Sequence, residues 1–318
     1  MISYQTAEPG AALVKVESET PVPQGTQVLV KIAACGVCHS DIHLHEGVFE
    51  LGNGKRLEVG RAGQVLGHEI FGEVVAVGAE AEGVDIGDRR VVFPWIGCGK
   101  CASCKRGEGH LCTPGRGLGI VEAGGFADYI MVPHGRYLFD KGDVPDSLAA
   151  TYACSGLTAY SALKKVGDCG EGDELVIIGA GGVGMMAVQI AQSVFNIQPI
   201  VVDIAEEKLV RAREMGAKYT FNSSDRLQVK ELKEVTGGGA YAAIDFVGAE
   251  SSVNFALRSL RKGGKLIVVG LFGVALNLPI PFIPLNARTI QGSYVGSLED
   301  MTELMAYVRD GQNSTHSN

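Results

Sequence analysis

The segment AACGVCHSDIHLHEG, residues 33–47, holds two cysteines, three histidines and an aspartate in fifteen positions. Residues of these types could form a redox dithiol, contribute to a metal site or line an ordinary polar loop. A catalytic zinc needs three protein ligands and one open position. His68 in GHE and Cys154 in YACSGLTAY are further candidate ligands, but no spacing rule forces them together with Cys38. The segment alone therefore leaves the alternatives open.

Four more cysteines lie in one short loop, CGKCASCKRGEGHLC, with two, two and seven intervening residues. Four thiolates can close a tetrahedral shell around zinc with no open position, which is typical of a structural site. An iron–sulfur cluster is the alternative, but its bacterial run has a short last spacing followed by proline, whereas Thr113 follows a long one here. Disulfides are disfavoured in a chain without an export signal. We predict a structural zinc on Cys98, Cys101, Cys104 and Cys112.

Residues 179–184, GAGGVG, match the pattern G-x-G-x-x-G between an apolar strand and a helix. Gly179 would allow the tight turn, Gly181 the approach of a pyrophosphate, and Gly184 the close packing of helix and strand. The helix N-terminus would offer free N–H groups to the phosphates. Asp203, at the end of the next strand, can accept hydrogen bonds from a ribose diol and would repel a 2′-phosphate. This context favours NAD over NADP, with a merely structural turn as the alternative.

The elements that must position these residues are of two kinds. Three β-rich runs between Gly and Pro turns, residues 26–34, 71–78 and 87–93, predict a small barrel or sandwich over the first 150 residues. After Pro145, apolar strands alternate with helices, which indicates a doubly wound parallel sheet of the α/β class. The helix after the glycine turn should bury one apolar face, formed by Val183, Met186, Ala187, Ile190, Ala191 and Val194.

Composition and charge exclude several classes of protein. The net charge of −8 argues against a nucleic-acid-binding surface, and no apolar run is long enough to span a membrane. The N-terminus, MISYQTAEPG, lacks the pattern of a secretory signal. Eight cysteines without such a signal suggest metal ligands or free thiols in a reducing compartment. We therefore expect a cytoplasmic protein with no nucleic-acid or membrane partner.

CHSDIH, GHE, the four-cysteine loop and GAGGVG, in this order, resemble the zinc-dependent alcohol dehydrogenases of the medium-chain dehydrogenase/reductase family. The resemblance runs from about residue 20 to about residue 309. It implies a GroES-like β-barrel catalytic domain at residues 1–148, to which residues 287–318 return, and a Rossmann NAD-binding domain at 149–286. It also implies reversible, NAD-linked oxidation of a primary or secondary alcohol to an aldehyde or ketone by hydride transfer, with two zinc ions per chain.

The resemblance further implies a catalytic zinc held by Cys38, His68 and Cys154. Glu69 resembles the family's carboxylate that can approach the metal, and Asp41 the carboxylate that orients the zinc-bound histidine. A helix N-cap is the alternative interpretation of Asp41. Cys35 forms C-x-x-C with Cys38, but if Cys38 binds zinc, Cys35 is better interpreted as a small buried residue.

Ser40 and His43 match the family's proton relay, and His39 matches a basic residue placed against the pyrophosphate. Thr158 matches a position beside the nicotinamide. Trp95 resembles a wall of the substrate pocket, with core packing as the alternative. Further cofactor contacts are expected at Gly182, Val183, Lys208, Val247 and Val269.

The sequence alone leaves other functions open. The polyol dehydrogenases of the same family usually have a carboxylate in place of Cys154, so Cys154 favours a simple alcohol dehydrogenase. A non-catalytic NAD-binding zinc protein, or a zinc-ribbon interaction module, are the remaining alternatives. The segment 274–285, VALNLPIPFIPL, resembles the family's edge strand for dimerisation, so we expect a homodimer or homotetramer.

The C-terminus departs from the family pattern. Family members continue beyond the helix expected at 298–309 and return to the catalytic domain with an arginine that contacts the pyrophosphate. This sequence ends in QNSTHSN, which is polar and lacks that arginine. Either the sequence is truncated or shifted in frame, or this is a variant with a shortened catalytic domain. In each case we expect the helix to pack on the barrel through Leu304, Met305 and Val308.

Overall fold

A computed structural model describes residues 1–225 and 227–311. The chain divides into two compact units. The first contains residues 1–49 and 57–157 and the chain from Gly296 on, and the second contains residues 50–56 and 158–295. The expected domain limits at 148 and 287 stay a prediction, and the polar ending after Gly311 lies outside the described residues.

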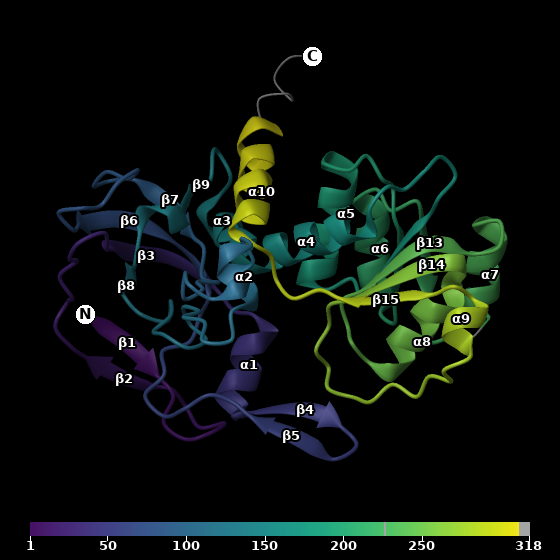
Figure 1. Ribbon diagram of the computed structural model, residues 1–318, viewed down its shortest axis with the longest axis horizontal. Helices are drawn as coiled ribbons and strands as arrows, with labels where there is room; N and C mark the ends of the chain where they lie inside the picture. The colour runs from purple at the N-terminus through teal and green to yellow at the C-terminus, as the bar shows by residue number, and fades with distance from the viewer. Residues whose placement is uncertain (226, 312–318) are drawn as a thin grey trace. The chain divides into compact units, whose positions relative to one another are not determined.

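The first unit is built on an antiparallel sheet with the order β8-β3-β6-β7-β9, visible around β3 and β6 in Figure 1. A separate β1–β2 pair is joined to its surroundings by isolated bridges, Ser3 to Ala127 and Gln5 to Val65. The predicted runs at 26–34, 71–78 and 87–93 all contain strands. The strands of this unit are β1 (Ile2–Gln5), β2 (Val14–Glu17), β3 (Val28–Gly36), β6 (Glu69–Val77), β7 (Arg89–Val92), β8 (Tyr129–Val132) and β9 (Leu138–Asp140).

Short helices carry Cys104, Cys154 and the candidate relay residues of this unit. They are α1 (His39–Glu46), α2 (Ala102–Lys105), η1 (Gly109–Leu111), η2 (Gly135–Tyr137), α3 (Asp146–Thr151) and the π-helical turn η3 (Tyr152–Gly156). The C-terminal helix α10 (Leu298–Gly311) contacts β9 and buries Met301, Leu304 and Met305. The prediction that it packs on the barrel side is confirmed, although Val308 is only half-buried.

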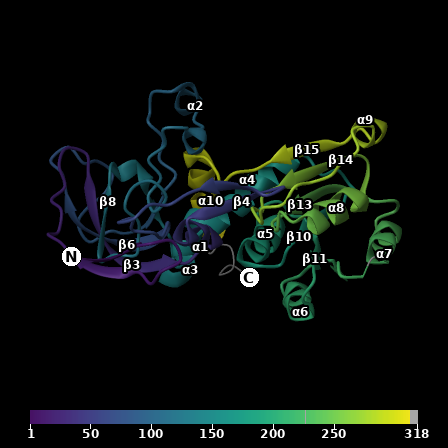
Figure 2. The ribbon, with the colours of Figure 1, turned by 90° about the horizontal axis from the view of Figure 1, so that it is seen from below.

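The second unit is a six-stranded parallel sheet with the order β12-β11-β10-β13-β14-β15. In chain order this is 3-2-1-4-5-6, the order of a Rossmann sheet. All four residues of β10 are buried, because helices cover both faces of the sheet (Figure 1 and Figure 2). The strands are β10 (Leu175–Ile178), β11 (Ile200–Asp203), β12 (Tyr219–Asn222), β13 (Ala240–Asp245), β14 (Leu260–Val268) and β15 (Thr289–Gly292).

Helix α5 (Gly182–Ser193) confirms most of the predicted apolar face. Met186, Ala187, Ile190 and Ala191 are buried, whereas Val183 and Val194 are half-buried because they lie at the two ends. The other helices of the unit are α4 (Leu157–Val166), α6 (Glu206–Glu214), α7 (Gln228–Val235), α8 (Glu250–Ser259) and α9 (Phe282–Leu285). The pattern of alternating strands and helices thus predicted this unit well.

Two segments of the second unit differ from expectation. The stretch 274–285 contains no strand, since residues 274–281 make no ladder and Phe282–Leu285 forms α9. The expected edge strand is therefore wrong for the single chain, and the outer strand of the sheet is β15. A hairpin of β4 (Val48–Gly52) and β5 (Lys55–Glu58) also sends residues 50–56 into this unit, where Gly52 and Gly273 leave no room for a Cβ.

Candidate zinc and cofactor sites

Cys38, His68 and Cys154 converge in the first unit, with their ligand atoms all within 4.8 Å of one another. The two sulfurs are 3.9 Å apart. Two thiolates bound at about 2.3 Å to one tetrahedral zinc would lie about 3.8 Å apart, so the separation fits. His68 is 0% exposed, and its Nε2 is buried without a hydrogen-bond partner. A buried imidazole nitrogen of this kind requires a partner, and a metal ion satisfies it.

Asp41 links the local helix to this ligand set. Its Oδ2 accepts a hydrogen bond from the backbone N–H of Cys38 at 2.9 Å, which satisfies the N-terminus of α1. Its Oδ1 lies 3.2 Å from Nδ1 of His68 and also accepts from Gly67 N at 3.1 Å. Asp41 is therefore not the N-cap itself, which is Cys38, but it bonds back to the N-cap from the third helical position while its other oxygen orients His68.

Cys154 lies in the π-helical turn η3, between α3 and α4. π-Turns are rare and are frequently found at functional sites. The Trp95 indole N–H donates to the carbonyl of Ala153 at 2.9 Å. On the other side, the Ser155 hydroxyl donates to Glu69 Oε1 at 2.7 Å. Sequence reasoning missed Ser155, and the only signal was a polar residue directly after a candidate ligand.

The protonation of the three ligands is linked. A hydrogen bond from Cys154 lowers the pKa of Cys38 to about 4, and the same bond raises the pKa of Cys154. Burial lowers the pKa of His68, but the hydrogen bond to Asp41 and the negative charges of Asp41 and the Cys38 thiolate outweigh it and raise that pKa to about 10. Burial raises the pKa of Glu69, against the hydrogen bond from Ser155. Cys38 is therefore the thiolate of the set, whereas Cys154 and His68 hold protons that a bound metal ion would displace.

The four-cysteine loop forms a second cluster, in which all four sulfurs lie within 4.8 Å of one another. Cys101 Sγ is 3.5 Å from Cys104 Sγ and 3.6 Å from Cys112 Sγ, again near the spacing of a tetrahedral thiolate site. Gly97 has no room for a Cβ because the sulfur of Cys104 lies against it. The backbone N–H groups of Lys100 and Cys101 lower the pKa of Cys98 to about 6, which favours its thiolate.

Helix α1 carries the candidate relay residues. Ser40 and His43 are three residues apart, so they lie on one side of the helix. The ring of His43 packs against His39 at 4.9 Å and against Phe49 at 4.4 Å between centroids. Burial and the nearby His39 lower the pKa of His43. His45, on the same helix, is held from outside it, because its Nε2 lies 2.6 Å from the carbonyl oxygen of Ala11.

The glycine turn of the second unit has the geometry expected of a phosphate loop. Gly179 has φ = 91°, in the left-handed region that favours glycine. A Cβ at Gly184 would overlap the Gly179 carbonyl oxygen, which requires glycine where helix and strand approach. The space beside Gly181 and Gly182 is open within this unit. The twelve-residue helix α5 begins at Gly182, so its free N–H groups lie at this turn.

Asp203 lies at the carboxyl end of β11, next to this turn. Its Oδ2 accepts from Ala180 N at 2.7 Å and its Oδ1 from Ala205 N at 2.9 Å. Lys208 Nζ is 4.0 Å from the same Oδ1. A carboxylate has about four lone-pair positions. Acceptor capacity therefore remains for a further donor, such as a ribose hydroxyl.

The switch in strand order lies between β10 and β13, where Rossmann sheets bind their ligands. Val247 and Val269 follow the ends of β13 and β14 on this edge. Asp245, which sequence reasoning missed, is buried and accepts from Val247 N at 2.9 Å, Gly248 N at 3.2 Å and Ser252 Oγ at 2.9 Å. The signal for it was an acidic residue ending an apolar strand, as Asp203 does.

Of the remaining predicted residues, Thr158 is buried on α4 and Trp95 is 7% exposed. The rings of Trp95 and His68 pack edge to face, with the centroids 5.3 Å apart. Trp95 therefore lies beside the ligand set, but it is almost fully buried within the first unit. Cys35 is half-buried, and burial raises its pKa to about 12, which disfavours a reactive thiolate.

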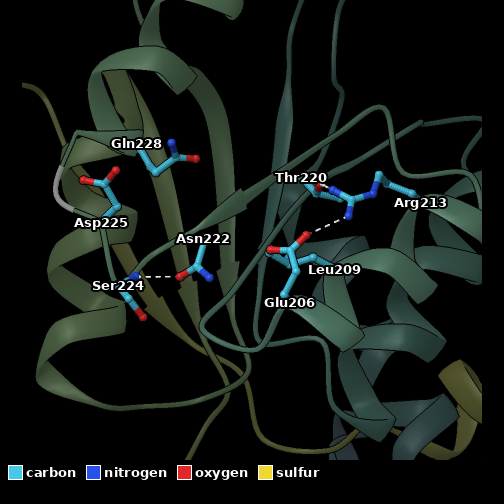
Figure 3. A pocket seen from close by; sticks show the side chains of 8 residues that line it. All are labelled: Glu206, Leu209, Arg213, Thr220, Asn222, Ser224, Asp225 and Gln228. Carbon is cyan, nitrogen blue, oxygen red and sulfur yellow. Dashed lines mark hydrogen bonds and ion pairs between the residues drawn. The ribbon is translucent and has the colours of Figure 1, made fainter.

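A polar pocket at the edge of the second unit is distinct from both metal clusters (Figure 3). Glu206 and Arg213 form an ion pair at 2.8 Å, and Arg213 also donates to Thr220 at 2.6 Å. Asn222 accepts from Ser224 N at 3.0 Å. These bonds connect helix α6 with strand β12, which ends at Asn222, the residue paired with Asp203. The pocket is lined by Glu206, Leu209, Arg213, Thr220, Asn222, Ser224, Asp225 and Gln228.

Both units match known protein families. Residues 24–143 match the family described as the alcohol dehydrogenase GroES-like domain. Residues 182–310 match the family described as zinc-binding dehydrogenase. Among the described residues, no helix is long and apolar enough to cross a membrane.

Individual proteins match over nearly the whole chain. An NAD-dependent alcohol dehydrogenase of Sulfurisphaera tokodaii is 40% identical over 321 residues, which cover 98% of this chain and 90% of that protein. The solved alcohol dehydrogenase of Aeropyrum pernix matches with a TM-score of 0.84 and 30% identity, over 98% of this chain and 90% of that chain. The D-arabinose dehydrogenase of Sulfolobus solfataricus matches with a TM-score of 0.84 and 28% identity, over 98% and 95%.

Proposed function

This chain belongs to the zinc-dependent alcohol dehydrogenases of the medium-chain family, and from that premise we propose that it oxidises a primary or secondary alcohol reversibly to an aldehyde or ketone with NAD. The observation that carries the proposal is the convergence of Cys38, His68 and Cys154, with a buried Nε2 that lacks a protein partner. Three ligands leave one position open for a substrate, as catalytic zinc sites do.

The residues of the first unit fit two zinc ions with different roles. Cys38, His68 and Cys154 would hold the catalytic ion, and the four cysteines of the loop would hold a structural ion with no open position. Bound zinc supplies Lewis-acid chemistry that lowers the pKa of an alcohol, and bound NAD supplies the hydride acceptor. Asp41 keeps His68 in the tautomer that presents Nε2 to the metal position.

The alcohol proton has an exit along α1 in this proposal. Ser40 would accept the proton first, and His43, one turn further along the same helix, would deliver it to water. The lowered pKa of His43 keeps its imidazole neutral near pH 7, so that it can accept a proton. Glu69 would remain beside the metal position as a carboxylate held by Ser155.

The second unit would bind NAD along the edge where β10 and β13 end. The turn from Gly179 to Gly184 and the N-terminus of α5 would receive the pyrophosphate. Asp203 would accept the ribose hydroxyls and exclude a 2′-phosphate, with Lys208 nearby. His39 of α1 would be the basic residue that the family places against the pyrophosphate. Val247, Val269 and Thr158 would line the remaining apolar part of the cofactor.

A metal analysis combined with a substrate panel tests the proposal. The purified chain should contain two zinc ions, and NADH should form with alcohols only while the zinc remains bound. Cys169→Ser is a matched control, since this half-buried cysteine lies outside both clusters and should leave activity unchanged. A protein that holds one zinc ion, or that binds NADH but oxidises no alcohol in the panel, would contradict the proposal.

The substrate panel should contain primary, secondary and aromatic alcohols together with polyols. One of the solved relatives is a D-arabinose dehydrogenase, so D-arabinose belongs in the panel. Cys154 in the ligand set favours a simple alcohol over a polyol. A kcat/KM for polyols or D-arabinose that exceeds every simple alcohol would overturn that preference, while leaving the zinc assignment intact.

We also propose that the chain is a homodimer or homotetramer that acts on a small molecule, without a nucleic-acid or membrane partner. Leu271, Phe272, Ile280 and Leu285 are exposed on the second unit, and apolar side chains of this size are typical of interfaces. Light scattering at micromolar concentration should give at least twice the chain mass of 33.4 kDa. A stable monomer contradicts this part of the proposal. A cytoplasmic location stays a prediction.

A further inference from the structure

The residues on either side of Cys154 are each held from outside the π-turn. The carbonyl of Ala153 accepts from the Trp95 indole at 2.9 Å. Ser155 donates twice to Glu69 Oε1, from its hydroxyl at 2.7 Å and its backbone N–H at 3.3 Å. Cys154 therefore lies between two anchored neighbours, which limit how far its backbone can move while these contacts hold.

Both anchors are themselves fixed. Trp95 and Glu69 are buried, at 7% and 3% exposure. The second oxygen of Glu69 lies against Gly36, where there is no room for a side chain. A buried indole N–H or carboxylate that lost its partner would remain unsatisfied, so these contacts are costly to break.

The same two anchors also touch the surroundings of a second ligand. Glu69 directly follows His68, and the Trp95 ring packs edge to face with the His68 ring at a centroid distance of 5.3 Å. Each anchor thus connects the segment carrying Cys154 to the segment carrying His68. Partners outside the ligand shell orient metal ligands and influence metal affinity in many proteins.

We propose that Trp95 and the Ser155–Glu69 pair are positioning residues that clamp the turn carrying Cys154 and so determine how slowly the catalytic zinc is released. The inference rests on the proposed assignment of Cys38, His68 and Cys154 as zinc ligands. It gives Trp95 a role that differs from a pocket wall, because a wall would change KM for bulky alcohols and leave zinc release unchanged.

Zinc release into excess metallochromic chelator tests the clamp on the full chain. Wild type should release two ions in two phases, and the phase missing from Cys38→Ala is that of the catalytic site. Trp95→Phe keeps an aromatic ring but removes the N–H, and Ser155→Ala removes the hydroxyl. Each should accelerate the catalytic phase by about 10-fold and leave the four-cysteine phase unchanged.

Matched variants separate the clamp from general loosening. Tyr137→Phe and Ser3→Ala remove a hydroxyl from other buried residues of the first unit, and should leave both phases unchanged. Ser155→Thr retains a hydroxyl donor and should restore slow release. If Trp95→Phe unfolds the unit, the absorption of the cobalt-substituted Ser155→Ala and Ser155→Thr proteins still reports the geometry at Cys154.

The outcomes distinguish failure of the proposed function from failure of the clamp. A wild type that binds only one zinc ion refutes the proposed function. A wild type with two ions whose catalytic phase is unchanged in either Trp95→Phe or Ser155→Ala overturns the clamp. Equal acceleration of both phases also overturns it, because that result describes a loosened unit. Catalytic-phase acceleration in both variants, with Ser155→Thr like wild type, supports it.

Discussion

The two units assemble their candidate sites in opposite ways. In the first unit, the ligand set comes from three distant segments, at Cys38, His68 and Cys154. In the second unit, the cofactor edge begins with one continuous strand, turn, helix and strand between Leu175 and Asp203. A contiguous site is visible in sequence spacing, because the elements that carry it are also adjacent. A dispersed site becomes visible only when a fold brings its parts together.

The four-cysteine loop sharpens this comparison, because it lies in the first unit but is contiguous. Its spacing alone predicted the cluster that the structure contains. Contiguity, and not the type of unit, therefore decides what spacing can predict. The two units should also respond differently to substitution, which the following variants test.

The largest effect is expected from Cys38→Ala in the dispersed site. Loss of the Lewis acid should reduce alcohol oxidation by at least about 10³-fold, because metal catalysis contributes several kcal/mol. NADH binding to the second unit should persist, since none of its contacts involves Cys38. Activity assays and NADH fluorescence titration measure the two effects. Loss of NADH binding together with activity would show that the units are not separable in this way.

Cys101→Ala should act on stability first. An incomplete four-cysteine shell leaves the loop without its ion, and loss of a metal belongs to the changes that cost on the order of 4 kcal/mol. Thermal melts with zinc analysis should show a lowered transition and one zinc ion fewer. Cys169→Ala, a cysteine change in the second unit, is the control. If Cys101→Ala and Cys38→Ala had the same melting curve and the same residual activity, the division into structural and catalytic zinc would be wrong.

Much of the architecture could be predicted from patterns in the sequence. Alternating strands and helices after Pro145 predicted the parallel sheet, and the spacing around Gly179 predicted the turn with φ = 91°. The β-rich runs located strands of the first unit. The ligand set of Cys38, His68 and Cys154 came from a family resemblance, because about thirty and then about eighty residues separate its members and no local periodicity spans such gaps.

The features that pattern missed depend on tertiary contacts. Ser155 is an ordinary hydroxyl in the sequence, and its meaning arises because Glu69, from a distant strand, lies 2.7 Å away. The stretch 274–285 alternates apolar residues as a strand would, but prolines at 279, 281 and 284 remove backbone donors. In the single chain it therefore makes no ladder, and Phe282–Leu285 forms α9.

Substitutions of Asp203 test the cofactor edge, which is the contiguous site. Asp203→Asn removes the charge but keeps the side chain's shape and an acceptor for the turn, whereas Asp203→Ala also removes the bonds to Ala180 N and Ala205 N. A hydrogen bond to a charged group contributes about 1.5 to 3 kcal/mol. In both variants the KM for NAD should therefore rise by about 10- to 100-fold, while the KM for NADP falls. The zinc content should stay at two ions per chain. Equal kcat/KM for both cofactors in the wild type would contradict the role of Asp203.

The smallest effect on the rate is expected at His43, and it is measured through the pH dependence of kcat. Burial and His39 lower the pKa of His43 from 6.5, so the residue is neutral above that value and charged only in more acidic solution. Only the neutral imidazole can accept a proton. The wild-type kcat should therefore fall as pH decreases below 6.5, with the acid limb lying at the lowered pKa.

His43→Gln removes the titrating group and should flatten this limb. The rate at pH 7 should fall by about 10-fold, less than the 10²–10⁴-fold contribution of a direct general base, because the substituted residue acts at the end of a relay and water can replace it. His45→Gln is the matched control, as His45 lies on the same helix but is held by the carbonyl of Ala11. Its pH profile should match wild type. An acid limb that persists unchanged in His43→Gln would assign the titration to another group and remove His43 from the relay, while leaving both zinc sites and the cofactor edge as they stand.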